Sequence, residues 1–139
     1  DKMREFTKAI GLAANGVGIG SFVYLRRVFE FLVFEAVERV QKDDGDFNKE
    51  LFDKSKMNEK IKMLAGYLPE FLVENYKIYG ILSKGVHELS EDECKEYFTV
   101  LRESIEMILD EKLERLQKEK RKKEIRTALN TITKKLTEE

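Results

Sequence analysis

Apolar residues recur every three or four positions along most of the chain, which is the spacing of an amphipathic α-helix. No segment shows the strict alternation of apolar and polar positions that predicts a β-strand. The pattern predicts helices over residues 2–14, 21–42, 58–67, 69–82 and 90–117, and a short helical turn over 46–52. We therefore expect an all-α bundle of five to six helices that forms one domain over residues 1–139.

The predicted helix over residues 21–42 is the most apolar element. Between Val28 and Phe34, six of seven residues are apolar, and only Glu30 interrupts them. A helix that is apolar on every side must be covered on every side. We therefore expect this helix to lie at the centre of the bundle or in a subunit contact, with Ser21 as its N-cap.

Three segments carry signals for helix ends. Asn15-Gly16 predicts the end of the first helix, because glycine readily adopts the conformation that a C-cap needs. Residues 83–88 interrupt the apolar pattern and predict a loop. Ser90 and Glu93 have the spacing of a capping box, with Leu89 as its hydrophobic staple, and predict the start of the longest helix.

The pattern changes after residue 117. Residues 117–124 contain no apolar side chain, and five of them are basic: Lys118, Lys120, Arg121, Lys122 and Lys123. An apolar stripe then resumes at Ile125, Leu129, Ile132 and Leu136. We expect a C-terminal helix over 117–139 that projects into solvent or packs on the bundle. The basic run is then a solvated helix face or a nucleic-acid contact.

The stripe needs a surface to cover it, and so does the apolar second helix. A small bundle offers little spare surface for both, so the chain is expected to form a homodimer or to be covered by a missing part of a longer protein.

The composition excludes several classes of protein. The 139 residues carry 26 basic and 27 acidic side chains, so global charge gives no argument for nucleic acid or an anionic membrane as the partner. One cysteine and one histidine form neither an internal disulfide nor a four-ligand zinc site, and we predict no metal and no cofactor. Without a membrane span or a signal peptide, the chain is expected to be soluble and cytoplasmic. It does not open with methionine, which fits a processed product or a domain excised from a longer protein.

Few residues are candidates for catalysis or ligand binding. The glycines of residues 16–20 do not match G-x-G-x-x-G, so we expect a tight turn that permits close helix packing rather than a phosphate cradle. Arg26 has the i,i+4 spacing for an ion pair with Glu30, and Arg27 is expected to pair across the bundle. A phosphate or carboxylate clamp is the alternative for both arginines. We expect Cys94 to be a small buried residue.

His87 is the one side chain whose ordinary pKa permits acid–base catalysis near neutrality. It is predicted to lie in a loop beside Lys84, immediately before a strongly capped helix. If it is functional, we expect it to work in a cleft between that loop and the second helix, with Arg26 or Arg27 nearby. The alternative is a solvated or capping histidine.

Two segments carry a resemblance to a known family. Gly18-Ile-Gly-Ser-Phe-Val-Tyr-Leu-Arg-Arg-Val-Phe-Glu30 and Leu82-Ser-Lys-Gly-Val-His-Glu-Leu-Ser-Glu91, followed by a long helix, resemble prokaryotic helical domains of the HEPN type. The resemblance covers about Phe6 to Leu116. It implies a small helical bundle that pairs as a dimer, of the kind found in toxin–antitoxin, CRISPR-associated and abortive-infection systems. Many such domains are metal-independent endoribonucleases, with an active motif of Arg, four to six residues, then His.

The chain departs from that motif. If His87 is the motif histidine, the arginine positions hold Gly80, Ile81 and Leu82. Lys84 is too close, so Arg26 or Arg27 would have to reach His87 through space. We therefore expect a binding or dimerisation module of a prokaryotic defence or regulatory protein. The alternatives are a ribonuclease that uses His87 with Arg26, Arg27 or Lys84, and a domain that binds nucleic acid, RNA included, through residues 118–123.

Overall fold

The computed structural model describes residues 2–14 and 16–138, and these are helical almost throughout. The helices are α1 (Lys2–Ala14), α2 (Gly18–Asp43), α3 (Lys49–Lys54), α4 (Met57–Met63), the 3₁₀ helix η1 (Ala65–Tyr67), α5 (Glu70–Glu74), α6 (Lys77–His87) and α7 (Glu91–Glu138). No strand occurs in the described ranges, which confirms the all-α prediction. The described residues form seven α-helices rather than five or six. No helix among them is long and apolar enough to cross a membrane.

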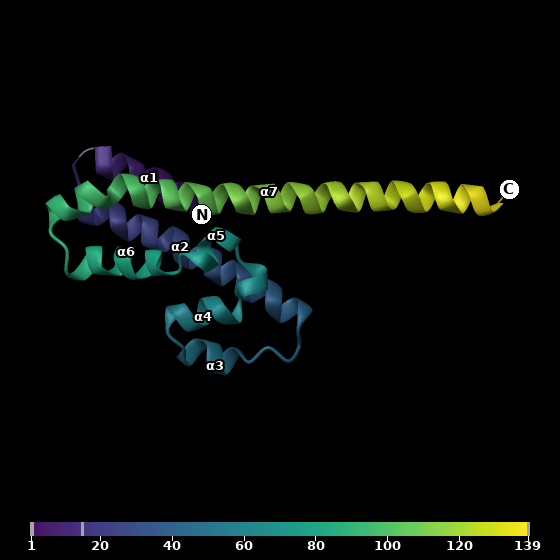
Figure 1. Cartoon of the computed structure of the whole chain (residues 1–139), viewed down its shortest axis with the longest axis horizontal. Helices are drawn as coiled ribbons and strands as arrows, with labels where there is room; N and C mark the ends of the chain where they lie inside the picture. Colours follow the sequence, from purple (N-terminus) through teal and green to yellow (C-terminus); the bar gives the residue numbers. More distant parts are fainter. Residues whose placement is uncertain (1, 15, 139) are drawn as a thin grey trace.

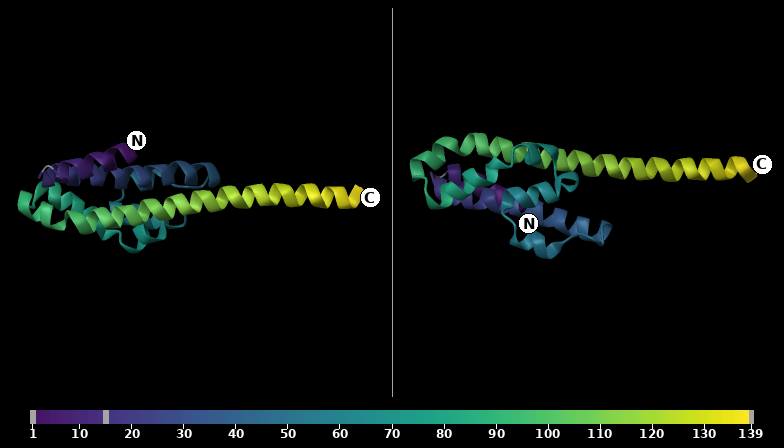
Figure 2. Two further views of the ribbon diagram at one scale, coloured as in Figure 1. Left: turned by 90° about the horizontal axis from the view of Figure 1, so that it is seen from above. Right: turned by 60° about the horizontal axis from the view of Figure 1, so that its bottom comes forward.

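Helix α2 is the central element of the bundle, as predicted. Helices α1, α6 and α7 pack against it, whereas α3 and α4 lie at the end of the bundle where α2 finishes (Figures 1 and 2). Its core side chains are completely buried: Phe22, Leu25, Val28 and Phe29. One edge stays open, because Phe31 and Phe34 remain 39% and 62% exposed.

Helix α6 continues through the segment predicted as a loop, so that prediction is wrong. Gly85 is buried within α6 and faces α2. A Cβ atom at this position would lie 2.0 Å from Cδ2 of Phe22. The glycine therefore admits an aromatic ring against the helix backbone and does not end the helix.

The start of α2 also differs from the prediction. The helix begins at Gly18, and Ser21 is not its N-cap, because the Ser21 hydroxyl donates to the Gly18 carbonyl at 2.6 Å. The Glu91 carboxylate of α7 accepts hydrogen bonds from the backbone N–H groups of Gly18 and Ile19, the latter at 3.1 Å. The residue that caps α2 thus comes from a distant part of the sequence.

A second carboxylate of α7 acts in the same way on α5. Glu111 accepts from the backbone N–H groups of Glu70 and Phe71, the latter at 3.0 Å. The predicted helix over 69–82 is in fact two helices. The first of them ends at Asn75, whose side chain and backbone N–H both donate to the Phe71 carbonyl at 3.0 Å.

The first helix ends in a Schellman arrangement. Val17 N–H donates to Leu12 O at 2.8 Å, Gly16 N–H donates to Ala13 O at 3.0 Å, and Gly16 has a φ of 77°. Gly16 thus takes the predicted capping role, while Asn15 lies outside the described residues.

Helix α7 starts at the predicted capping box and is the longest element, with 48 residues. Ser90 Oγ accepts from Glu93 N–H at 3.1 Å, and the Glu93 carboxylate accepts from Ser90 N–H at 3.0 Å. Its buried residues end at Leu109, and residues 113–138 are exposed. The helix therefore leaves the bundle as a straight extension (Figures 1 and 2). We call residues 117–138 the tail.

Candidate functional site

The two arginines of the predicted clamp bind different partners. Arg26 Nε lies 3.3 Å from the Tyr79 hydroxyl of α6 and 3.9 Å from a Glu30 carboxylate oxygen. Arg27 Nη1 lies 3.6 Å from Glu5 of α1, across the bundle. Both predicted ion pairs are confirmed. The geometry directs one guanidinium towards α6 and the other towards α1, so the two do not converge on one anion.

His87 is the last residue of α6 and is exposed, as is Lys84 one turn earlier. A helix turns about 100° per residue, so His87 lies about 200° round α6 from Gly85, which faces α2. Lys84 is about 60° round the helix from His87, so the two lie on adjoining exposed positions of α6. No hydrogen bond or ion pair in the described ranges joins either residue to Arg26 or Arg27. The structure thus brings together two of the four residues expected to act in catalysis.

The glycine turn before α2 packs closely, as expected. A Cβ on Gly18 would lie 2.8 Å from the Glu91 carbonyl oxygen and 2.9 Å from Cys94 Cβ. The donors that a phosphate would use at the start of α2 are already bound to Glu91. The protein supplies its own anion at this helix terminus.

Cys94 lies behind this turn and is fully buried, which confirms the prediction for it. Its thiol donates to the Gly85 carbonyl at 3.5 Å. Burial, together with Glu91 and Glu93, raises the pKa of Cys94, which disfavours the nucleophilic thiolate. Among the residues that the structure describes, no cluster of three metal-ligating side chains occurs.

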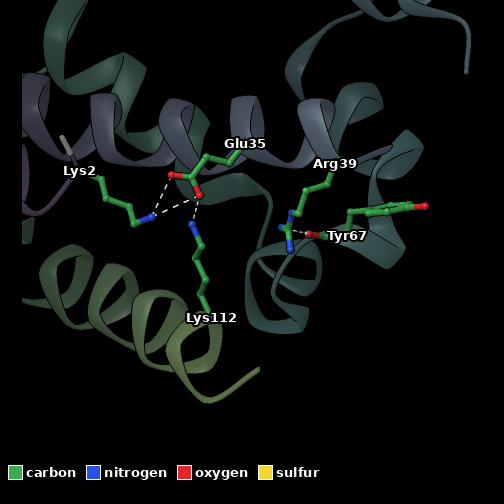
Figure 3. A network of polar contacts seen from close by, with 5 residues as sticks. All are labelled: Lys2, Glu35, Arg39, Tyr67 and Lys112. Carbon is green, nitrogen blue, oxygen red and sulfur yellow. Dashed lines mark hydrogen bonds and ion pairs between the residues drawn. The ribbon is translucent and has the colours of Figure 1, made fainter. Parts of the chain in front are cut away.

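A partly buried polar network ties α7 to the bundle. Glu35 of α2 accepts from Lys2 of α1 at 2.9 Å and from Lys112 of α7 (Figure 3). Burial and the neighbouring Lys2 ammonium lower the pKa of Lys112 to about 8. This network holds three helices together where the long helix is about to leave the bundle.

Beyond this network, cations gather round an open cleft of about 440 Å³ between the end of α2, η1 and α7. The basic side chains that line it are Arg39, Lys42, Arg115, Lys118 and Lys122. Two carboxylates, Asp43 and Glu119, line it as well. We call this the cationic cleft. Two residues of the predicted basic run, Lys118 and Lys122, therefore face a concave surface.

The other three cations of this cleft are not among the residues predicted from the sequence. One signal was present, because Arg115, Lys118 and Lys122 are spaced i, i+3 and i+7 and so lie on one face of a helix. Arg39 and Lys42 are distant in sequence, and only the packing of α2 beside α7 brings them there. Lys120, Arg121 and Lys123 are exposed but do not line the cleft.

The apolar stripe of the tail has no cover within the described chain. Ile125, Leu129, Ile132 and Leu136 are 49%, 56%, 54% and 66% exposed. Their 4-3-4 spacing keeps them on one face of α7. Exposed leucine and isoleucine in a continuous row on a helix are typical of a helix–helix interface.

Comparison of the chain with family models, curated proteins and solved structures finds no match in any of the three. The tail and the cationic cleft are therefore the features from which a function can be inferred.

Proposed function

We propose that this chain is a helical interaction module that associates with a second copy of itself through the tail of α7. The observation that carries the proposal is the stripe of four half-exposed aliphatic residues on a helix that has left the bundle. The resemblance to HEPN-type domains, which pair as dimers, supports the same interpretation. On that resemblance, we place the module in a prokaryotic defence or regulatory protein.

The charges beside the stripe favour an antiparallel pair. In a parallel coiled coil, Lys118 would face Lys118 of the other copy in the core, and Lys122 would face Lys122. Arg121 would lie beside Arg126 of the other copy. These like-charge pairs are destabilising. The parallel arrangement is therefore disfavoured.

An antiparallel pair centred between residues 130 and 131 avoids those contacts. The 4-3-4 spacing reads the same in both directions, so Ile125 meets Leu136 of the other copy and Leu129 meets Ile132. The flanking positions then place Arg126 beside Thr133 and Lys135 beside Ala128, with no like-charge pair. Each of the four core layers combines one isoleucine with one leucine.

The size of this interface sets the expected affinity. Eight side chains that are about half exposed gain roughly 1 kcal/mol each on burial, or about 8 kcal/mol in total, before the cost of association. That sum corresponds to a dissociation constant no tighter than about 1 µM. We therefore expect a weak, reversible dimer whose dissociation constant is about 1 µM or higher.

Sedimentation equilibrium from about 1 to 300 µM tests the proposal. The 16.3 kDa chain is expected to shift from monomer to dimer, and Leu129→Ser/Ile132→Ser to remain a monomer. The matched control is Leu113→Ser/Leu116→Ser, which removes equally exposed residues of α7 outside the stripe and should still dimerise. A wild-type monomer throughout, or a dimer that survives loss of the stripe, refutes the proposal.

Disulfide trapping tests the orientation. A mixture of Ile125→Cys and Leu136→Cys chains should form a mixed disulfide dimer faster than either chain forms a homodimer. Preferential homodimers of Ile125→Cys would show a parallel pair instead. Cys94 does not interfere, because it is buried in the bundle.

A further inference from the structure

The cationic cleft carries an excess of positive charge, because five cations and two carboxylates line it. Within the described ranges, four of its five cations form no ion pair: Arg39, Lys42, Lys118 and Lys122. Only Arg115 has a carboxylate partner, Glu111 at 3.9 Å, and that carboxylate already binds two backbone N–H groups of α5. Like charges that share one concave surface raise the local positive potential and attract an anion.

Both arginines of the cleft donate to backbone carbonyls, which are neutral groups. Arg39 Nη2 donates to the Tyr67 carbonyl at 2.7 Å (Figure 3), and Arg115 Nη1 donates to the Leu68 carbonyl at 2.8 Å. A carbonyl orients a guanidinium without cancelling its charge, and each guanidinium has five N–H donors. Both arginines are therefore positioned beside the cleft with further donors available for a ligand.

The arrangement of charge favours a chain of phosphates over a single anion. Arg115, Lys118, Lys122 and Arg126 lie three to four residues apart and follow one face of α7 over about 16 Å. A nucleic-acid strand carries one negative charge per nucleotide, so a row of cations along one helix face can contact several successive phosphates. Arg39 and Lys42 oppose the row from α2.

Tyr67 lines the same cleft and favours a single strand. Unpaired bases stack on aromatic side chains, whereas the bases of a duplex are not accessible for stacking. We propose that the cationic cleft binds the phosphodiester backbone of a single-stranded nucleic acid. The residues that line the cleft precede the apolar stripe along α7, so the proposed binding does not require dimerisation.

Fluorescence anisotropy with a labelled oligonucleotide of about 12 nucleotides tests the proposal, with RNA and DNA of the same sequence as separate probes. Binding should weaken steeply from about 50 to 200 mM salt. Lys118→Gln/Lys122→Gln should weaken binding roughly tenfold and reduce the salt slope by about 1.4, or about 0.7 for each phosphate that the variant no longer neutralises. Tighter binding of RNA than of DNA would indicate that the protein binds the 2′-hydroxyl.

The matched control is Lys120→Gln/Lys123→Gln. It removes the same charge from the same two turns of α7, on residues that do not line the cleft. The control should bind within about twofold of the wild type. An equal loss in both double variants would overturn the cleft as the site, since the basic run would then act only through its total charge. Absence of salt-dependent binding to either probe, or equally tight binding of a mononucleotide, would overturn the proposal of a strand.

Discussion

Replacing Gly85 by alanine puts a methyl group into space that the Phe22 ring already occupies. The new carbon would lie 2.0 Å from Cδ2 and 2.6 Å from Cε2 of that ring, where carbon atoms pack best at roughly 3.5–4.0 Å. Phe22 is completely buried, so the ring cannot swing into solvent. Either α6 must move away from α2 by about 1.5 Å, or the ring must adopt a strained rotamer.

The cost is partly offset by helix propensity. Alanine is favoured over glycine inside a helix by about 1 kcal/mol, whereas overpacking of a core costs about 1–3 kcal/mol or more. Because the new carbon overlaps the ring so strongly, we expect a net loss of about 2 kcal/mol in the free energy of unfolding. For a domain of this size, that corresponds to a fall in melting temperature of roughly 6–10 °C.

The same helix supplies a matched control. Gly80 also lies in α6, and a Cβ there would meet nothing within 4 Å. Gly80→Ala should therefore gain up to about 1 kcal/mol from propensity alone. Urea unfolding followed by circular dichroism measures both variants. If Gly85→Ala is as stable as Gly80→Ala, α6 does not pack closely on Phe22.

Contacts of α7 give three further predictions. Glu91→Ala removes the carboxylate that caps α2 and should lower the free energy of unfolding by about 1–2 kcal/mol, while Glu103→Ala, an exposed acid of the same helix, should stay within about 0.5 kcal/mol. Lys112 has a pKa of about 8 in the folded chain against 10.5 ordinarily, so between these pH values the unfolded chain binds more protons and the stability from this group rises with pH. The wild type should therefore gain stability relative to Lys112→Gln over that window and not below it, and a constant difference would contradict the lowered pKa. Cys94 should react with a thiol reagent only at the rate of unfolding, because it is buried and its pKa is raised; rapid labelling of the native protein would contradict its burial.

Local patterns predicted much of this fold. The central position of α2 follows from its apolar residues on every side, and the start of α7 follows from the Ser90–Glu93 capping box. The ion pair between Arg26 and Glu30 follows from their spacing along one helix. Each of these features is set by residues within about two turns of one another.

The features that the sequence did not reveal depend on contacts between distant residues. Gly85 resembles a helix breaker unless it is known that Phe22 packs on it, and the start of α2 depends on Glu91, which is 73 residues from Gly18. The cationic cleft is of the same kind, because Arg39 joins Lys118 only through tertiary packing. The basic run itself could be recognised in the sequence, but which of its residues line a concave surface could not.

The unbroken helix α7 passes from the bundle core into solvent, and this has a consequence for its backbone amides. Amides near Ile105 and Ile108 are sequestered with the core and should exchange with solvent deuterium only through global unfolding. Amides of the tail form the same i to i−4 hydrogen bonds, but no other helix packs against them. They should therefore exchange through local fraying of the helix, at far higher rates. One regular helix should thus show a gradient of protection over several orders of magnitude. Addition of a binding partner that covers the tail should flatten this gradient from its outer end inward.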